Sequence, residues 1–341
     1  MNILYLTPVF EASEILCRLA VSPAANKWQS SLVKALSELT PQVKTYGHLP
    51  EPFWPKGQLF PKLDSKGHSF NQMCLAPYVN VPLLRGLTLK IAYKMFLNSL
   101  LYDSKSDIVL VTYNPPGWLQ DLLIKYTSSK QFSWVSIVAD GGAPSKADGL
   151  VFLSYGYYKS YPIVDAKKMH LDGALYQNLV SGDVQKKGSR IVLMYSGTSS
   201  KWGGVSYLLE AYLKLCQKVD VELWISGAGD YSQFSKQYSH EPSIKFFGML
   251  SESELEERYK QADIFINPRP ELYDNDKNFP SKLFDYISYG KPVISFKTSG
   301  LSHQYDGLLI FPTENSVEAL ANSIEKVMNW TDSERQFYAS N

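Results

Sequence analysis

One segment in the second half of the chain combines helix-boundary residues with a carboxylate one helical turn inside. Residues 278–292 read Asn-Phe-Pro-Ser-Lys-Leu-Phe-Asp-Tyr-Ile-Ser-Tyr-Gly-Lys-Pro. Pro280 suits the first position of a helix and Gly290 suits the position after its end. We therefore expect a short helix over 281–289, preceded by a loop that contains Asn278.

The start of this expected helix has the chemistry of an anion site. The first amides of a helix have no partner within it, so those of Ser281 and Lys282 can bind a phosphate, aided by the helix dipole. Asp285 lies one turn after Ser281 on the same face, where its carboxylate can accept from both hydroxyls of an attached ribose. The segment therefore indicates a nucleotide-diphosphate site. The alternative is a capped surface helix with an incidental aspartate.

A second segment has phosphate-binding residue types. Residues 195–204 read Tyr-Ser-Gly-Thr-Ser-Ser-Lys-Trp-Gly-Gly between an expected strand and an expected helix. Gly197 lets the backbone turn, Thr198 offers a hydroxyl and an amide, and Lys201 supplies a positive charge. A solvated loop lysine is the alternative. Because both segments lie at strand-to-helix crossings in one half of the chain, they favour a shared site.

Alternating strands and helices must position these segments. Apolar runs predict strands at 3–6, 108–111, 134–138, 151–154, 190–196, 221–226, 244–247, 264–266 and 293–295. Helical spacing predicts helices at 27–39, 83–102, 118–126, 232–238, 252–262 and 317–330. This order predicts an α/β protein of two doubly wound, Rossmann-like domains, 1–180 and 181–341, joined near the polar run 181–189. In such folds a ligand is expected in the cleft between the domains.

The charge balance excludes one class of function and leaves an asymmetry. The 341 residues contain 34 basic and 33 acidic side chains, and this net charge of +1 argues against a nucleic-acid-binding protein. Residues 1–180 carry 17 basic and 12 acidic residues, a net +5, whereas residues 181–341 carry 17 and 21, a net −4. The basic half is therefore the one expected to meet an anionic membrane surface or a lipid-diphosphate acceptor.

The cysteines and the apolar runs indicate a compartment. Cys17, Cys74 and Cys216 are widely spaced, which argues against a disulfide framework or a cysteine zinc site and favours a reducing compartment. No stretch approaches 18 uninterrupted apolar residues, and the first residues do not read as a signal peptide. A cytoplasmic location is expected.

The order of motifs after residue 190 resembles the C-terminal domain of retaining GT-B glycosyltransferases, close to glycosyltransferase family four. The matching motifs are the strand–Gly–Lys–Gly–helix at 190–216, Ile-Ser-Gly-Ala-Gly at 225–229, Phe-Gly-Met-Leu at 247–250, Ala-Asp-Ile-Phe-Ile-Asn-Pro at 262–268 and the 280–292 helix. The resemblance implies a GT-B fold and a metal-independent, retaining sugar transfer from a nucleotide-diphosphate donor, which we expect to be UDP-linked.

The resemblance also implies roles for individual residues. Lys201 would grip the diphosphate as a catalytic cation, the amides of Ser281 and Lys282 would bind phosphate, and Asp285 would hold the ribose. Further donor-binding candidates in the same segments are Gly197, Thr198, Asn278 and Pro280.

Two departures from the family pattern name further candidates. Relatives carry two glutamates separated by seven residues; with Asp285 as the second acid, the first position falls on Lys277. The acids that could replace it are Glu271, Asp274 and Asp276. The usual arginine near the first glycine loop is also missing, and Arg269 is the candidate that supplies its charge. Asp274-Asn275-Asp276 spells a metal motif of another architecture, but no buried strand precedes it, so we expect no metal site.

The first half resembles the family loosely. Ala-Asp-Gly-Gly at 139–142 fits the segment that faces the donor sugar, which makes Asp140 a catalytic candidate. The aromatic and Pro-rich stretch 46–82 reads as a long irregular excursion and is the expected acceptor determinant. The helix over 83–102 is either a core helix with a basic edge or a helix that lies on an anionic membrane.

Together these patterns predict a glycosyltransferase of the bacterial polysaccharide type. It would transfer a hexosyl group to a glycan or lipid-linked acceptor, with no cofactor besides the nucleotide sugar, in the cytoplasm or at the inner face of the membrane. The alternatives are a UDP-sugar epimerase of similar architecture and a non-catalytic glycan-binding protein.

Overall fold

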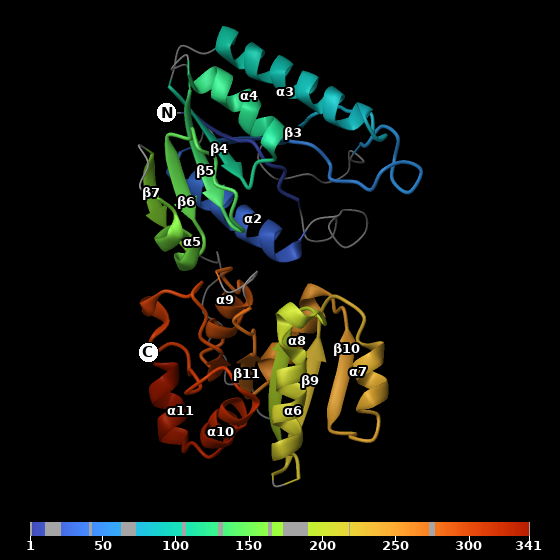
Figure 1. Cartoon of the computed structure of the whole chain (residues 1–341), viewed down its shortest axis with the longest axis vertical. Helices are drawn as coiled ribbons and strands as arrows, with labels where there is room; N and C mark the ends of the chain where they lie inside the picture. Colours follow the sequence, from blue (N-terminus) through green and yellow to red (C-terminus); the bar gives the residue numbers. More distant parts are fainter. Residues whose placement is uncertain are drawn as a thin grey trace. The chain divides into compact units, whose positions relative to one another are not determined.

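The chain folds into two compact units, Met1–Tyr176 and Gln177–Asn341, which Figure 1 shows with their helices and strands labelled. The structure is a computed structural model. It describes residues 2–10, 22–40, 43–62, 73–103, 107–128, 132–162, 166–172, 190–217, 219–272 and 277–340. The junction of the units and the expected linker 181–189 lie outside the described residues. Each unit is therefore described by itself.

Unit 1 is built on a parallel sheet with β1 near its centre. Its strands are β1 (Asn2–Tyr5), β2 (Val43–Gly47), β3 (Met73–Leu75), β4 (Ile108–Tyr113), β5 (Ser133–Val138), β6 (Gly149–Phe152) and β7 (Lys167–His170). Its helices are α2 (Pro23–Leu39), α3 (Leu84–Asp103), α4 (Gly117–Thr127) and α5 (Tyr155–Ser160). The described strands pair in the order β3-β2-β1-β4-β5-β6-β7. Since β1 pairs in parallel with both β2 and β4, the chain winds outward in both directions from β1.

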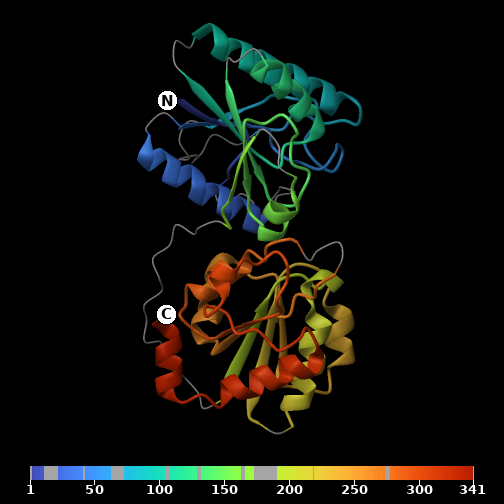
Figure 2. The ribbon, with the colours of Figure 1, turned by 60° about the vertical axis from the view of Figure 1, so that its left-hand side comes forward.

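Helices cover both faces of this sheet. On one face, Trp28 and Val33 of α2 pack against Ile3 and Tyr5 of β1. On the other face, α3 and α4 lie side by side over the sheet, and their buried side chains join a second cluster around Trp134. Figure 2 shows α2 and the α3–α4 pair on opposite sides of the strands. A sheet buried on both faces explains why its strands read as continuous apolar runs in the sequence.

Unit 2 repeats this plan with a smaller sheet. Its strands are β8 (Ile191–Ser196), β9 (Val221–Ser226), β10 (Ile244–Gly248), β11 (Ile264–Asn267) and β12 (Val293–Ser295), paired in parallel in the order β10-β9-β8-β11-β12. Its helices are α6 (Val205–Leu215), α7 (Ser232–Gln237), α8 (Glu252–Gln261), α9 (Lys282–Ile287), α10 (Val317–Met328) and α11 (Asp332–Ala339), with 3-10 turns η1 (Lys201–Gly203) and η2 (His303–Tyr305). The winding reverses between β8 and β11, because β8 pairs with β9 on one side and with β11 on the other.

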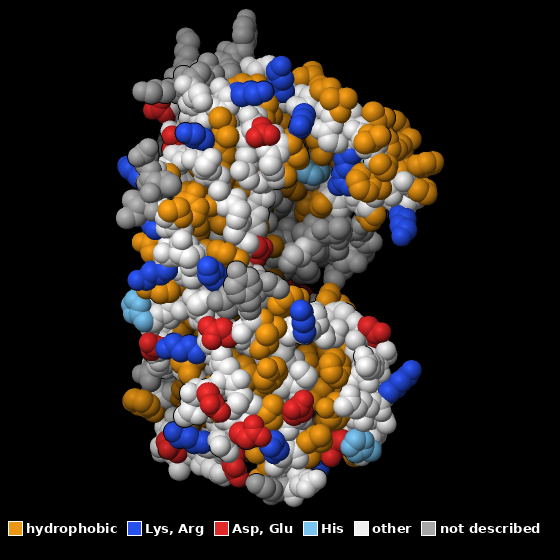
Figure 3. Space-filling view, in the orientation of Figure 1, with side chains coloured by type: hydrophobic (Ala, Val, Ile, Leu, Met, Phe, Trp, Pro, Cys, Tyr) orange, Lys and Arg blue, Asp and Glu red, His pale blue; other side chains and the backbone are white. Residues whose placement is uncertain are grey.

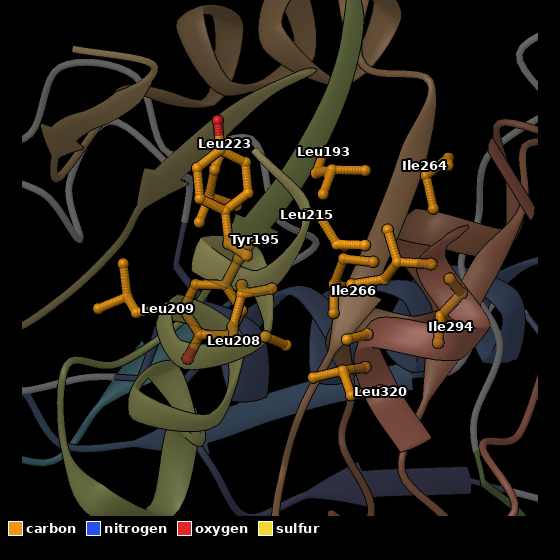
Figure 4. Packing of buried hydrophobic residues seen from close by; sticks show 14 of the residues in the cluster. Leu193, Tyr195, Leu208, Leu209, Leu215, Leu223, Ile264, Ile266, Ile294 and Leu320 are labelled. Atoms are coloured by element: carbon orange, nitrogen blue, oxygen red, sulfur yellow. The ribbon is translucent and has the colours of Figure 1, made fainter. Parts of the chain in front are cut away.

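Two apolar clusters hold the unit 2 sheet. The larger one joins α6 and α10 to one face of the strands, and Figure 4 shows Leu208 and Leu320 among its members. The smaller one packs Tyr259 of α8 and Tyr286 of α9 against Phe265 of β11 on the opposite face. Local signals agree with this packing. Ser251 and Glu254 form a capping box at the start of α8.

The predicted fold class is confirmed, and the differences are local. The predicted helix 281–289 is shorter, since α9 begins at Lys282 and ends at Ile287, and Pro280 precedes its cap residue. The stretch 46–82 is only partly irregular, because the end of β2 and the short strand β3 lie within it. The predicted strand 151–154 corresponds to β6, which begins earlier, at Gly149, and ends at Phe152. Ser154 is not part of the strand but is the N-cap of α5.

Candidate functional site

The loops that follow β8 and β11 meet at the carboxyl edge of the unit 2 sheet. Gly204 ends the β8 loop with a positive φ of +75°, and a Cβ built on it would lie 1.9 Å from the carbonyl oxygen of Pro268. Only glycine permits this approach, so the two loops can pack this closely because Gly204 has no side chain. This edge is also where the winding of the sheet reverses, the place where doubly wound folds bind ligands.

The β9 loop closes on the same region. Gly227 has a φ of +127°, and a Cβ on it would lie 1.8 Å from the carbonyl oxygen of Gly197. Two backbone hydrogen bonds link these loops: Gly197 N–H donates to Ser226 at 2.9 Å, and Ser199 N–H donates to Ala228 at 3.1 Å. The backbone around Gly197 is therefore fixed by contacts with β9 rather than by its own sequence.

Two tyrosine hydroxyls fix the turn after β8. The hydroxyl of Tyr195 donates to the carbonyl of Thr198 at 2.9 Å, and that of Tyr231 donates to the carbonyl of Gly197 at 3.0 Å. Burial raises the pKa of Tyr195, which keeps the phenol protonated as a donor. Because both carbonyls of the turn are occupied by hydroxyls, the turn is held in one conformation.

A second tyrosine group holds α9 under β8. The amide of Ser196 donates to the hydroxyl of Tyr286 at 2.8 Å, and the Ser196 hydroxyl contacts that of Tyr259. Burial raises the pKa of Tyr259 and of Tyr286, and the Asp285 carboxylate adds to both rises. Asp285, the residue expected to bind the ribose, therefore lies half-buried beside these phenols on α9.

The side chain of Lys282 brings a positive charge to the β8 loop. Its ammonium lies 4.1 Å from the centre of the Tyr195 ring and 3.0 Å from a Cβ built on Gly197. Burial and, to a smaller extent, the positive charge of Arg269 together lower the pKa of Lys282 to about 7. Among the described residues, no carboxylate forms an ion pair with this ammonium. Two cations thus approach one another at the carboxyl edge of β8 and β11.

The structure brings Gly197, Thr198, Lys282 and Arg269 into one region, and the sequence had predicted only the amide of Lys282 as a contact. The helix α9 has six residues, and Ser281 is its cap with no side-chain capping bond. The sequence feature that could have predicted a contact by the Lys282 side chain is its position one residue after Ser281, at the start of the helix. At the start of a helix that points at a glycine turn, that side chain can reach the turn.

Lys201 is placed differently. It is exposed at the start of η1, and its ammonium lies 4.3 Å from the centre of the Trp202 ring. Pro280 is buried before α9, and Asn278 is half-buried, with its carbonyl oxygen 2.5 Å from a Cβ built on Gly300. Glu271 is exposed in the loop after β11. The two other acid candidates, Asp274 and Asp276, lie outside the described residues.

Asp140 lies in unit 1, just after β5. Its carboxylate accepts from the Asn114 side-chain amide at 3.3 Å. Asn114 has a φ of +41° and its side-chain oxygen accepts from the Ala139 amide at 2.8 Å. Asn114 therefore ties the loops after β4 and β5 together and orients Asp140 at the carboxyl edge of the unit 1 sheet.

Two classes of feature are absent from the described residues. No group of three or more His, Cys, Asp or Glu side chains there is arranged to hold a metal ion. Nor is any helix in the described ranges both long and apolar enough to cross a bilayer.

Comparison with known proteins gives the second half of the chain a family match. Residues 190–329 match the family described as "Glycosyl transferases group 1". An uncharacterised glycosyltransferase of Methanocaldococcus jannaschii is 21% identical over 146 residues, which are 40% of this chain and 36% of that protein. The matched segment thus spans about a third of that relative's length.

Solved structures resemble nearly the whole chain. Sucrose-phosphate synthase of Thermosynechococcus elongatus gives a TM-score of 0.67 at 12% identity, with 99% of this chain and 91% of that chain covered. The catalytic domain of starch synthase IV of Arabidopsis thaliana, bound to ADP and acarbose, gives 0.69 at 10% identity, with coverages of 99% and 94%. The HepE protein of Anabaena, in complex with UDP and glucose, gives 0.59 at 13% identity, with coverages of 100% and 93%. At these identities the similarity shows the fold, which is GT-B.

The family match and the meeting loops lie in the same part of the chain. The family match covers β8 to α10, the part of unit 2 whose loops meet at Gly204 and Gly227. Unit 2 is therefore similar to glycosyl transferases group 1 over residues 190–329.

Proposed function

We propose that the chain is a retaining glycosyltransferase, similar to family four, that transfers a sugar from a UDP-linked donor. The acceptor in this proposal is a glycan or a lipid-linked glycan, and the reaction needs no metal ion. The three widely spaced cysteines favour a reducing compartment, so the proposal includes a cytoplasmic location. Unit 2 would bind the donor and unit 1 the acceptor.

The observation that carries this proposal is the pair of cations at the carboxyl edge of β8 and β11. Lys282 is half-buried beside Arg269, and both burial and this neighbour disfavour its charged form. An anion bound between them would remove both penalties, because it would pair with each charge. A diphosphate suits the site, since it carries enough negative charge to pair with two cations at once.

The same groups can assist the departure of the diphosphate. As the bond between the anomeric carbon and the phosphate oxygen breaks, negative charge develops on the phosphate, and Lys282, Arg269 and Lys201 can stabilise it. The acceptor oxygen forms its bond to the anomeric carbon on the same face, and its proton passes to the departing phosphate oxygen. Asp285 would hold the ribose and Asp140 would face the donor sugar.

Calorimetry with UDP tests the donor site. We expect Lys282→Met and Asp285→Ala each to weaken UDP binding about tenfold to hundredfold, the value of one lost charge-assisted contact. Lys214→Ala is the matched control, because Lys214 is exposed in the same unit and pairs with Glu318 at 2.7 Å. Unchanged UDP affinity in both site variants would overturn the site assignment.

Product analysis tests the reaction. The protein is incubated with a panel of UDP-sugars, with and without glycan acceptors. Transfer that needs an acceptor and gives a product of the donor's anomeric configuration supports the proposal. Isomerisation of the sugar without acceptor would instead identify an epimerase. UDP binding with neither reaction across the panel would favour a non-catalytic binding protein.

A further inference from the structure

Helix α3 of unit 1 carries large apolar side chains on both of its faces. Leu89, Tyr93 and Leu97 point into the unit 1 core and are almost completely buried. Leu87 and Ile91, on the opposite face, are at least half exposed. A helix that packs on a sheet through one face normally has a polar outer face. The outer face of α3 therefore needs an explanation that core packing does not supply.

The exposed apolar side chains form a stripe along α3. Leu87, Ile91 and Met95 follow one another at intervals of four residues, which places them on one face at about 3.6 residues a turn. Leu84 extends the stripe at the helix start, and Leu83 precedes it with 95% of its surface exposed. Leu83 also has a φ of +70°, a conformation that a leucine rarely adopts. The fold thus keeps the bulky apolar side chain of Leu83 exposed although its backbone conformation is unfavourable for a leucine.

A loop next to the start of α3 presents further aromatic side chains. Phe53, Trp54 and Phe60 are each about half exposed. The Asn80 side chain holds this loop, because its amide donates to the carbonyls of Pro52 at 2.7 Å and of Gln58 at 2.8 Å.

Arg85 ties the loop to the helix. Its guanidinium donates to the Glu51 carbonyl at 2.8 Å and lies over the Phe53 ring at 5.0 Å. The aromatic side chains and the α3 stripe thus belong to one fixed surface, which we call the α3 surface. It consists of Phe53, Trp54, Phe60, Leu83, Leu84, Leu87, Ile91 and Met95.

Within 43–62 and 84–100, every exposed charged side chain is basic. Lys90 and Lys94 are exposed along one edge of the stripe, and Lys56 and Lys62 are exposed in the loop. The acids within 43–62 and 73–103 are Glu51 and Asp103, and Glu51 is buried, with its carboxylate bonded to the Gln58 amide. Figure 3 shows hydrophobic side chains gathered at the upper right of unit 1, with lysine and arginine beside them.

We propose that the α3 surface docks on an anionic phospholipid bilayer. Its apolar side chains would enter the interface between headgroups and acyl chains, while its lysines meet the headgroup phosphates. A protein partner is disfavoured as occupant, because protein interfaces are depleted in lysine, whereas four lysines border this surface. This proposal stands apart from the sugar transfer reaction, since every residue of the surface lies in unit 1 and none belongs to the candidate donor site.

Flotation of the full chain with vesicles tests the proposal. Neutral vesicles contain phosphatidylcholine, and anionic vesicles add phosphatidylglycerol. We expect the protein to bind anionic vesicles and to bind neutral vesicles at least about tenfold more weakly, with the difference shrinking at high salt. The double variant Leu87→Ser/Ile91→Ser should lose most binding to both. Lys90→Ala/Lys94→Ala should lower anionic binding only.

Control variants keep the test specific. Leu39→Ser and Phe337→Ser each remove a side chain that is more than two-thirds exposed outside the α3 surface, so both should bind vesicles like the wild type. Circular dichroism melting shows that each variant is folded, and UDP affinity measured in parallel separates this test from that of the donor site. A wild-type chain that does not bind anionic vesicles would overturn the proposal. So would a dimer that dissociates in the Leu87→Ser/Ile91→Ser variant, because the surface would then be covered by a second copy.

Discussion

Lys282 is held in a position where its charge depends on what is bound. Burial and the neighbouring Arg269 lower its pKa to about 7, so the free protein holds this lysine partly neutral near neutral pH. An anion beside it favours the ammonium, and binding is then accompanied by proton uptake. This residue therefore connects the affinity of the site to pH.

We expect UDP binding to weaken as the pH rises from 7 to 9, because Lys282 must be protonated in the complex and is progressively neutral in the free protein. The terminal phosphate of UDP is already ionised above pH 7, since its pKa is about 6. Affinity should fall by up to about tenfold per pH unit above the pKa of Lys282. Calorimetry in buffers of different ionisation enthalpy measures both the affinity and the proton uptake.

Lys282→Arg is the control, since an arginine keeps its charge over this range. Its affinity should change little between pH 7 and 9. Parallel pH profiles of the wild type and of this variant would contradict the assignment. The same pKa has a consequence for stability: the unfolded chain binds one more proton than the folded one between about pH 7 and 10, so this group favours folding more as the pH rises.

For the individual residues of the candidate site, the sequence predicted which residue types matter better than it predicted which atoms they contact. Gly197 and Lys282 could be singled out because glycine turns and helix starts have recognisable spacing. Tyr195 could not, because an aromatic residue at the end of a buried strand reads as core. Its role in holding the turn depends on a hydroxyl that donates to the carbonyl of Thr198, just after the strand ends.

The loops of unit 2 depend on contacts between backbones. Gly204 meets the β11 loop and Gly227 meets the β8 loop at distances that exclude a Cβ. Because three strands end at this edge, each loop fixes the conformation of the next. A change in one of them is expected to reach the Lys282 region through Gly197.

Gly227→Ala should destabilise unit 2 by about 2–5 kcal/mol, from the overlap with Gly197 and from its positive φ. It should also abolish most UDP binding, since the turn after β8 must move. Gly248→Ala separates the two causes, because Gly248 has a φ of +65° with nothing within 4 Å of an added Cβ. That variant should lose only about 1–2 kcal/mol and retain UDP affinity. Chemical denaturation measures the free energy of unfolding, and calorimetry measures the UDP affinity. Equal losses of stability and affinity in the two variants would show that the positive φ alone, and not the overlap with Gly197, causes the effect.

Most elements could be predicted from the sequence because their signals are local. The α8 helix carries its capping box within four residues, and the apolar strands of both units lie at the predicted places. The strands β2, β3 and β7 were not predicted, because β3 has only three residues and β2 and β7 mix polar with apolar side chains. The order of the sheet that contains β3 depends on pairing with β2, which no local pattern reports.

At the scale of the whole chain, the apolar cores belong to separate units. The clusters around Trp134 and Trp28 contain only residues of unit 1, and those around Leu208 and Tyr259 only residues of unit 2. Each unit therefore has the buried surface to fold by itself. The predicted charge asymmetry follows the same division, with the basic half containing the α3 surface.

We expect residues 177–341, expressed alone, to fold cooperatively and to bind UDP within about threefold of the full chain. The physical reason is that every described residue of the candidate donor site, and both cores beneath it, lie within unit 2. Circular dichroism melting establishes folding, and calorimetry gives the affinity. A folded fragment without UDP affinity would mean that unit 1 contributes essential contacts to the nucleotide. The same fragment should not bind anionic vesicles.

The close approach at Gly204 and Gly227 also bears on how this protein can change over evolutionary time. Neither position accepts any other residue without displacing a neighbouring loop, so we expect selection to remove substitutions there. Exposed side chains on these loops are not under this backbone constraint. Under the proposed function, lineages can thus acquire new donor or acceptor preferences through the loop surfaces while the backbone beneath them stays the same.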